Sequence, residues 1–527
     1  MIRNHTIREH RSRTGEWASW LTPRRTLAAL LIAFAAVVIG AGSYKYSYWG
    51  HGFDMVDFHM PIWGTIRGHF LLVSRYNFTD TFMGLDVALG FLPAIPFYAL
   101  VPSAYTLVVL QTLLLASAAV PVYLIARDRM GSPWAGVACA ALYLLYPTTQ
   151  FMAMAAPFQP RVPALVLFFW AFLALERRRP GWYLTLLFLA MLARTDAALV
   201  TVAFGMYAAL RRMPLRYSVP PVLVGLTYFY VAITYVTPRF YSESFTPPPQ
   251  IEVPFDLTRD YNDLWPCGVS PQACYYLHLG GSIPNIVRNI LTHPVEIFFF
   301  ITQPAKLTYL ALMFGGLLFL PLFAPRELLL AAPIFAINLL SNRVYQYVIT
   351  EQYQILAIPG MVIAAIYGAG WLLEALERAT RLASAGGWWR AWPPDTGRVA
   401  FYGTLVALVA LLNLPLKNPV VSAVRYPERP ERVAVMERMR AMIPPDAAVA
   451  ATSFLAPHLL PRLEIYYIPG GPMHHQPDEA DYAFIDARAA GLRDQQARGN
   501  DILGRLLADP AWELLDEEDD LYLLRRR

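Results

Sequence analysis

The chain has 527 residues, of which 56% are hydrophobic and 15% are charged, and its formal net charge is +5. Soluble domains are typically about 45–50% apolar and about 25% charged, so this composition excludes an ordinary soluble enzyme and indicates a multi-pass membrane protein. The positive charge comes from arginine clusters between apolar segments. It therefore reports membrane orientation and gives no indication of a nucleic-acid partner.

Eleven apolar segments are long enough to be membrane helices if some are short or bent inside a bundle. Residues 1–25 precede the first of them, carry several arginines and are followed by no convincing cleavage site, which predicts a cytoplasmic N-terminus and an uncleaved first span. The predicted spans are 26–43, 104–126, 132–150, 161–175, 181–193, 196–210, 217–236, 305–323, 327–341, 354–374 and 399–415.

Short cytoplasmic loops collect Lys and Arg, and this rule tests the order of the spans. The stretch 181–210 is interrupted by "ARTD" at 193–196, and we predict two short helices that meet outside, because an unbroken helix would put 176–180 and 211–216 on opposite sides. All five loops expected inside are then basic: 126–131, 176–180, 211–216, 324–327 and 377–398.

Three regions are expected outside the membrane. Within the first exported loop, 44–103, the apolar patch 87–101 is short and contains two prolines, so we interpret it as re-entrant or interfacial. The second exported loop, 237–304, carries Cys267 and Cys274, which could close a disulfide in an oxidising compartment. The multi-pass domain covers 26–415, and the tail, 416–527, is predicted to form a small extracytoplasmic α/β domain.

Polar residues that border or interrupt the apolar segments gather on the exported side of this topology. An ionised Asp or Arg at a bilayer centre costs about 2.5–3.5 kcal/mol on insertion scales, so such residues usually face a cavity or a partner. One external cavity could hold them all: Asp54, Asp57, His59, Asp86, Gln159, Arg161, Arg194 and Asp196.

Several of these residues have a second interpretation. Asp54 and Asp57 have the spacing of a helix capping box, although Pro61 argues against a continuous helix and fits the start of an interfacial stretch. His59 could bind a metal ion beside the two acids or be an interfacial histidine. The arginines could bind phosphate or extend to the membrane surface, and Asp196 could pair with Arg194 or cap the next helix.

The order of several motifs resembles a known family. Asp54 stands nine residues before Trp63, "PFYAL" (96–100) and "YLLYP" (143–147) follow, and the tail contains "VAATSFLAPHL" (449–459) before "DYAFIDAR" (481–488). These motifs are similar to those of the predicted membrane proteins of the domain-of-unknown-function 2079 family, which is related at fold level to GT-C glycosyltransferases. The resemblance covers the chain from about residue 45 to its end.

The departures from the family are concentrated where chemistry would occur. Asp54 and Asp196 match the family's acids. Elsewhere a histidine is replaced by Asp86, the second acid of the first loop is displaced by His59, Phe-His-Pro-Glu reads FQPR (158–161), and Lys-Glu-Asp reads RTD (194–196).

The resemblance implies a GT-C-like enzyme. In GT-C enzymes an acid similar in position to Asp54 is a base or metal ligand that activates an acceptor toward a sugar on a polyprenyl phosphate. Cations or a bound divalent metal ion would neutralise the leaving phosphate. The resemblance implies catalytic roles for the matching acids Asp54 and Asp196. Because one external cavity could hold the other polar residues, we predict substrate-binding roles for Asp57, His59, Asp86, Gln159, Arg161 and Arg194.

The expected function is therefore sugar transfer from a membrane lipid-linked donor on the outer face of the cytoplasmic membrane. The substituted positions leave open a second function, that of a non-catalytic carrier or scaffold for lipids or glycans. A transporter is disfavoured because the sequence has neither inverted repeats nor a paired pattern of broken helices.

Overall fold

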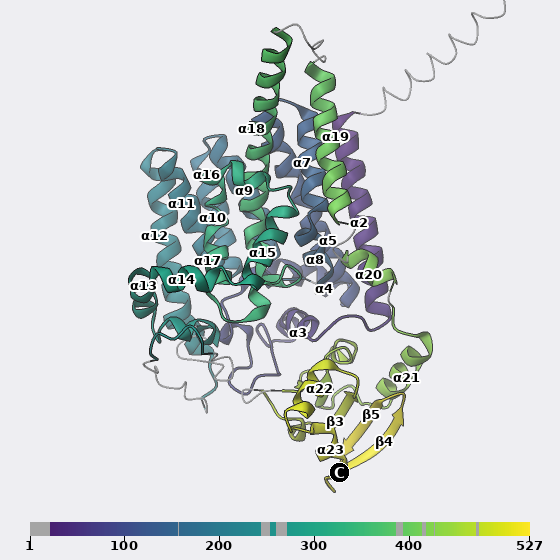
Figure 1. Ribbon diagram of the computed structural model, residues 1–527. Helices are drawn as coiled ribbons and strands as arrows, with labels where there is room; N and C mark the ends of the chain where they lie inside the picture. Colours follow the sequence, from purple (N-terminus) through teal and green to yellow (C-terminus); the bar gives the residue numbers. More distant parts are fainter. Residues whose placement is uncertain are drawn as a thin grey trace, which may run out of the picture.

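The computed structural model describes residues 22–155, 158–243, 253–259, 271–385, 394–413, 418–425, 427–470 and 474–527. A bundle of helices forms most of the molecule, and an α/β unit built from the tail lies at one end of it (Figure 1).

Every one of the eleven predicted spans is occupied by a helix. Within the described residues, four helices are long and apolar enough to cross a membrane, or up to six if each of two bent pairs is one span. The other helices are shorter and complete the bundle. The bounds are α2 (Pro23–Ser47), α5 (Ala104–Ser117) with α6 (Ala119–Met130), α7 (Pro133–Leu145), α9 (Arg161–Glu176), α10 (Pro180–Ala193), α11 (Ala197–Leu210), α12 (Leu215–Val231), α15 (Pro304–Gly315), α17 (Ala332–Leu340), α18 (Ile358–Ala385) and α19 (Pro394–Asn413).

Breaks between the helices follow local sequence signals. α7 and α8 (Pro147–Ala155) meet at 50°, and α14 (Pro294–Ile301) and α15 meet at 64°, in both cases with a proline opening the second helix. α10 ends at Ala193, where Arg194 takes an extended backbone conformation, and α11 begins at Ala197. The predicted break at 193–196 is therefore present.

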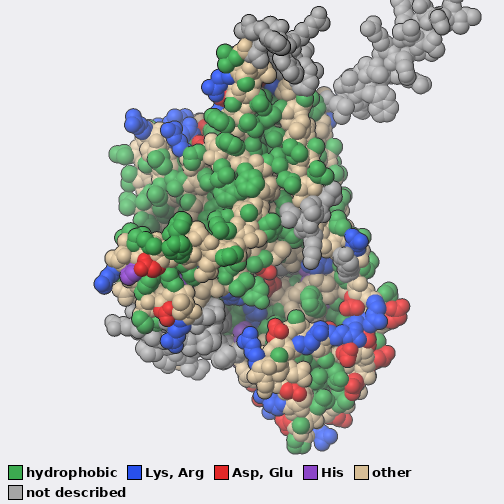
Figure 2. Space-filling view, viewed as in Figure 1, with side chains coloured by type: hydrophobic (Ala, Val, Ile, Leu, Met, Phe, Trp, Pro, Cys, Tyr) green, Lys and Arg blue, Asp and Glu red, His purple; other side chains and the backbone are tan. Residues whose placement is uncertain are grey.

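The basic loops lie together at the end of the bundle remote from the α/β unit, where Figure 2 shows clustered Lys and Arg side chains. Two ion pairs join different loops, Arg177 to Asp128 at 2.9 Å and Arg211 to Glu176. A third, Arg398 to Glu377 at 2.7 Å, joins the two ends of the loop 377–398. This is the segregation that the loop sequences predict. Short helices at this end are η7 (Leu320–Phe323) and α16 (Pro325–Leu328).

The opposite end of the bundle carries short helices that lie across it (Figure 1). The predicted re-entrant segment forms η2 (Leu89–Ala94) and α4 (Ile95–Leu100), six residues each and too short to cross a membrane. Cys267 lies outside the described residues, as does the side chain of Cys274. The remaining elements here are α3 (Asp54–Ile66), η1 (Phe82–Gly84), η3 (Ala232–Val236), η4 (Thr237–Phe240), η6 (Pro271–Leu279), α13 (Ile283–Thr292), η8 (Val344–Tyr347) and η9 (Gln352–Ala357).

The tail forms a mixed five-stranded sheet in the order β2-β1-β3-β5-β4. β1 (Val449–Thr452) pairs in parallel with β2 (Ile465–Ile468) and β3 (Tyr482–Asp486), whereas β5 (Leu521–Arg526) is antiparallel to β3 and to β4 (Trp512–Glu518). Helical segments of the tail are α20 (Pro419–Arg425), α21 (Pro430–Ala441), η10 (Ala456–Leu459), η11 (Pro477–Glu479), α22 (Ala490–Ala497) and α23 (Ile502–Ala508).

One core of the α/β unit includes residues of the segment 44–103, which the sequence predicts to be the first exported loop. Trp49, Phe53, Val56 and Met60 are buried in the same cluster as residues of β1, β3 and β5. The backbone N–H of Phe53 donates to Ser453 Oγ at 3.0 Å, and the N–H of Ile465 donates to the hydroxyl of Ser74 at 2.9 Å. The α/β unit thus holds the segment that positions α3.

Candidate functional site

α3 lies between the end of the bundle and the α/β unit (Figure 1). It begins at Asp54 with Phe53 at the N-cap, and no side chain caps it, so the capping-box interpretation is wrong. It also continues through Pro61 to Ile66, contrary to the predicted break. Nine of its thirteen residues are buried, and this packing compensates for the hydrogen bond that proline cannot make.

Asp54 and Asp57 differ in environment although both lie in the first turn of α3. The Asp54 side chain is exposed and makes no ion pair or hydrogen bond with any residue that the structure describes. Asp57 is buried, and its Oδ2 lies 2.6 Å from Arg75 Nη2. Burial raises the pKa of Asp57 to about 7, against the opposing attraction of Arg75. Asp54 is the acid that is open to a reaction partner.

His59 is hydrogen-bonded to a tyrosine. Its Nε2 lies 2.6 Å from the hydroxyl of Tyr98, and the ring is buried. No group of three His, Cys, Asp or Glu side chains suited to a metal ion occurs in the described part of the chain. Asp54, Asp57 and His59 therefore do not fit a shared metal ion.

A second set of polar residues meets where α9 begins and α10 gives way to α11. Arg161 Nη2 lies 2.6 Å from Asp196 Oδ2, and Arg194 Nε lies 2.7 Å from Asp86 Oδ2. Gly90 presses against both chain breaks, since a Cβ there would lie 2.1 Å from the Pro160 carbonyl oxygen and 2.9 Å from that of Ala193. We call residues 86, 159–161 and 194–196 the break region.

Four buried polar atoms of the break region have no hydrogen-bond partner among the described residues: Gln159 Oε1, Arg161 Nη1, Thr195 Oγ1 and Asp196 Oδ1. Such atoms are costly in a low-dielectric interior, and native proteins usually satisfy them with water or a ligand. They include both donors and acceptors, which suits hydroxyl groups better than an isolated charge. The break region thus offers polar recognition, with each arginine paired to a carboxylate.

The turn between α17 and α18 lies next to both Asp54 of α3 and the break region. We did not identify this turn from the sequence. Glu351 lies near enough to Asp54 that this charge, together with burial as the larger cause, raises the pKa of Glu351. Two residues on, the ring of Tyr353 lies 5.7 Å from Arg161 Cζ. The available signal was a polar, tyrosine-rich run between two predicted spans, "NRVYQYVITEQY" (342–353).

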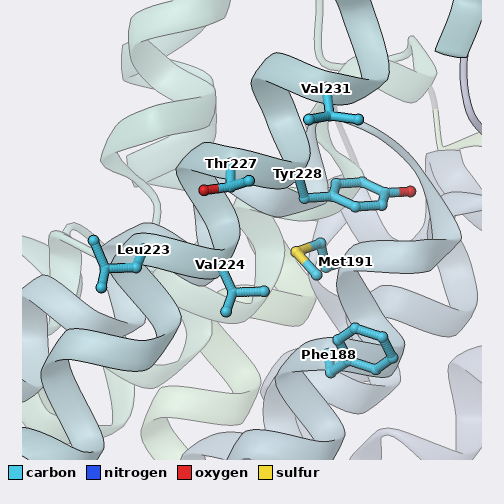
Figure 3. A pocket seen from close by; sticks show the side chains of 7 residues that line it. All are labelled: Phe188, Met191, Leu223, Val224, Thr227, Tyr228 and Val231. Atoms are coloured by element: carbon cyan, nitrogen blue, oxygen red, sulfur yellow. The ribbon is translucent and has the colours of Figure 1, made fainter. Parts of the chain in front are cut away.

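An apolar groove of about 380 Å³ opens between α10 and α12. In Figure 3 the hydroxyl of Tyr228 points away from Leu223 and Val224, which line the same groove. Asp86 interacts electrostatically with Tyr228, so this wall of the groove adjoins the break region. The lining residues are Phe188, Met191, Leu223, Val224, Thr227, Tyr228 and Val231.

The fold and the site define a class: a mostly helical, multi-span membrane protein with a C-terminal mixed five-stranded sheet domain. Within that class the chain belongs to the predicted membrane protein family DUF2079, whose family model matches residues 50–523. No curated protein matches the sequence.

Solved structures give a similarity of fold. ArnT from Cupriavidus metallidurans, in a crystal structure with undecaprenyl phosphate, is 14% identical with a TM-score of 0.46, covering 94% of this chain and 97% of that one. The archaeal oligosaccharyltransferase AglB from Archaeoglobus fulgidus, in complex with an inhibitory peptide and a dolichol-phosphate, is 14% identical with a TM-score of 0.46, covering 87% of this chain and 69% of that one. At this identity the similarity concerns the fold alone.

Proposed function

We propose that the protein is a GT-C-like glycosyltransferase that moves a sugar from a polyprenyl-phosphate donor to an acceptor on the outer face of the membrane. The observation that carries the proposal is the state of Asp54. It is exposed at the start of a helix fixed between two domains and is not neutralised by an ion pair with any described residue. A carboxylate in this state can accept the proton of an acceptor hydroxyl or amine.

Arg343 is our candidate for the cation that faces the leaving phosphate. It forms no ion pair within the described residues, its Nη1 donates to the Tyr275 hydroxyl, and its charge acts on Glu351 beside Asp54. Arg161 and Arg194 are held by carboxylates, so we assign them, with Asp86 and Asp196, to the framework of the site. Gln159 and Thr195 would contact sugar hydroxyls, and the apolar groove would receive part of the lipid chain.

The test is transfer of label from radiolabelled polyprenyl-phosphate sugars by purified protein in lipid nanodiscs. Asp54→Asn should lower the rate at least about a hundredfold, the range typical of general acid–base catalysis. Asp80→Asn is the matched control, because Asp80 is an exposed acid in the same loop. Unchanged transfer by Asp54→Asn would remove the mechanism.

A second function, that of a non-catalytic carrier of lipids or glycans, is favoured by the pairing of both break-region arginines. Because Asp196 and Asp86 neutralise them, neither keeps a full charge for a phosphate. Binding of polyprenyl-phosphate sugar that persists in Asp54→Asn, without turnover by the wild type, would support it.

A further inference from the structure

The second exported loop contains a helix, α13, whose side chains fall into three stripes. Ser282 opens it, with its side chain accepting from the Asn285 N–H. None of its ten residues is buried. Residues four apart lie on one side of a helix, so each stripe can be read from the sequence spacing.

One flank of α13 contacts the rest of the protein. Ile286, Asn289 and Ile290 are half-buried there, and Asn289 Nδ2 donates to the Leu279 carbonyl at 2.8 Å. His293 extends this contact, because its ring stacks on the ring of Phe255 with 4.3 Å between the ring centroids. This flank fixes the rotation of the helix about its own axis.

The other two sides of α13 are exposed and opposite in character. Ile283, Val287 and Leu291 form an apolar stripe, and Leu291 is 74% exposed. Asn285, Arg288 and Thr292 form a polar stripe. A helix in water would turn its apolar stripe toward the protein, whereas here the fixed flank leaves that stripe outside.

The apolar stripe continues into the next helix. α14 exposes Val295, Phe298 and Phe299, with exposed fractions of 62%, 57% and 67%. α14 and α15 together pass the length and hydropathy test for a bent membrane span. In Figure 2 hydrophobic side chains cover the bundle face down to the level at which Figure 1 places α13 and α14.

We propose that α13 lies in the plane of the membrane surface, with the Ile283, Val287 and Leu291 stripe in the acyl chains and the Asn285, Arg288 and Thr292 stripe in the headgroup layer. The partner of this surface is the lipid bilayer. A helix with a sharply divided apolar and polar face is the type that binds there. Continuity with the exposed side chains of α14 favours lipid over a protein partner, because both helices present one apolar surface. This inference does not depend on the proposed function.

One consequence concerns the position of the candidate functional site relative to the bilayer surface. η6 precedes α13 and is joined to the end of α17, since the Asn342 N–H donates to the Tyr275 carbonyl at 3.1 Å and His278 Nε2 lies 3.0 Å from the Leu340 carbonyl oxygen. The turn that carries Arg343 and Glu351 starts at this point. α13 therefore fixes that turn relative to the bilayer surface.

The test places an environment-sensitive fluorophore on each stripe of the full-length protein in phosphatidylcholine nanodiscs. In a background of Cys139→Ala, Cys267→Ser and Cys274→Ser, Leu291→Cys and Asn285→Cys are labelled in turn. Leu507→Cys, on an exposed position of α23, is the control for water. Val287→Cys repeats the measurement on the apolar stripe if Leu291→Cys folds poorly.

Brominated acyl chains should quench the label at residue 291 and leave the label at residue 285 nearly unchanged. Iodide should quench the label at 291 at least about threefold less than the label at 507. Iodide quenching at 291 equal to that at 507 would overturn the proposal, as would equal bromolipid quenching at 291 and 285.

Discussion

Asp54, Asp57 and Arg75, which we call the α3 region, contain the same kinds of charged side chain as the break region, but only the break region has all of its described charges paired. In the break region two arginines and two aspartates form two ion pairs beneath the protein surface. In the α3 region Asp57 is paired with Arg75, while Asp54, one turn away, is unpaired and exposed. The difference follows from solvation, because an ionised group out of water needs a partner and one at the water surface does not.

The largest expected effect comes from breaking a pair in the break region. Arg161→Leu leaves the Asp196 carboxylate without its cation, which should lower the free energy of unfolding by about 3–5 kcal/mol. Asp54→Ala should change it by no more than about 0.5 kcal/mol, as for other exposed positions. Thermal unfolding of both variants in detergent measures the contrast, and the double variant Arg161→Leu/Asp196→Leu should recover much of the loss. Equal losses of stability in Arg161→Leu and Asp54→Ala would mean that Asp54 is also structurally paired.

Removing the cation of the α3 region should cost less and should depend on pH. Arg75→Leu leaves Asp57 buried, but this acid can take up a proton, so we expect a loss of about 2–3 kcal/mol at pH 8. The folded-state pKa of Asp57, about 7, lies above its ordinary value. The contribution of the Asp57 carboxyl to the free energy of unfolding is therefore most favourable at low pH, and it is lost as the pH rises through 7. The deficit of the variant should shrink between pH 8 and pH 5 in chemical-denaturation experiments; a constant deficit would contradict this assignment.

Contact between the α/β unit and the bundle should weaken in acid. The His458 ring is stacked between the rings of Tyr46 and Trp49, with centroid-to-centroid distances of 4.4 Å and 4.0 Å. Burial and the nearby charge of Arg440 lower the pKa of His458 to about 3. Stability from a lowered pKa is present above the ordinary value and is lost as the pH falls. The undocked histidine would titrate near 6.5, so acidification to pH 5 should disfavour docking by about 2 kcal/mol through His458 alone.

Hydrogen exchange of residues 449–470 at pH 7 and pH 5 measures this loss. His458→Phe keeps the stacking and should remove about half of the pH dependence. The remainder should come from His51, whose pKa burial also lowers to about 3. An unchanged pH dependence in His458→Phe would exclude His458 as its source.

The smallest effect is expected from an unpartnered atom of the break region. Thr195 Oγ1 is buried without a hydrogen-bond partner in the described structure, so Thr195→Val should change the stability of the ligand-free protein by less than about 1 kcal/mol. If sugar hydroxyls bind there, KM for a polyprenyl-phosphate sugar should rise while kcat changes little. A destabilisation above about 2 kcal/mol would instead indicate a hydrogen bond essential to the fold.

Much of the fold could be predicted because hydrophobic segments and basic loops are local signals. Each predicted span contains a helix, the break at 193–196 is present, and the tail forms an α/β unit. The interpretations of Asp54 as an N-cap and of Pro61 as a break were wrong, because the α/β unit and the bundle bury α3 and hold it as one helix. Spacing alone does not include that packing.

The membrane class, the order of helices and the residues worth examining were determined by the sequence itself, since apolar length and arginine placement are sufficient for each. Only the tertiary structure decided which acids are free. The partners of Asp57 and Asp86 lie 18 and 108 residues away along the chain. The α/β core that fixes α3 joins residues about 400 apart, such as Phe53 and Ser453. Whether a charge is paired depends on such contacts. The local sequence "GFDMVDFHMPIW" therefore does not distinguish the role of Asp54 from that of Asp57.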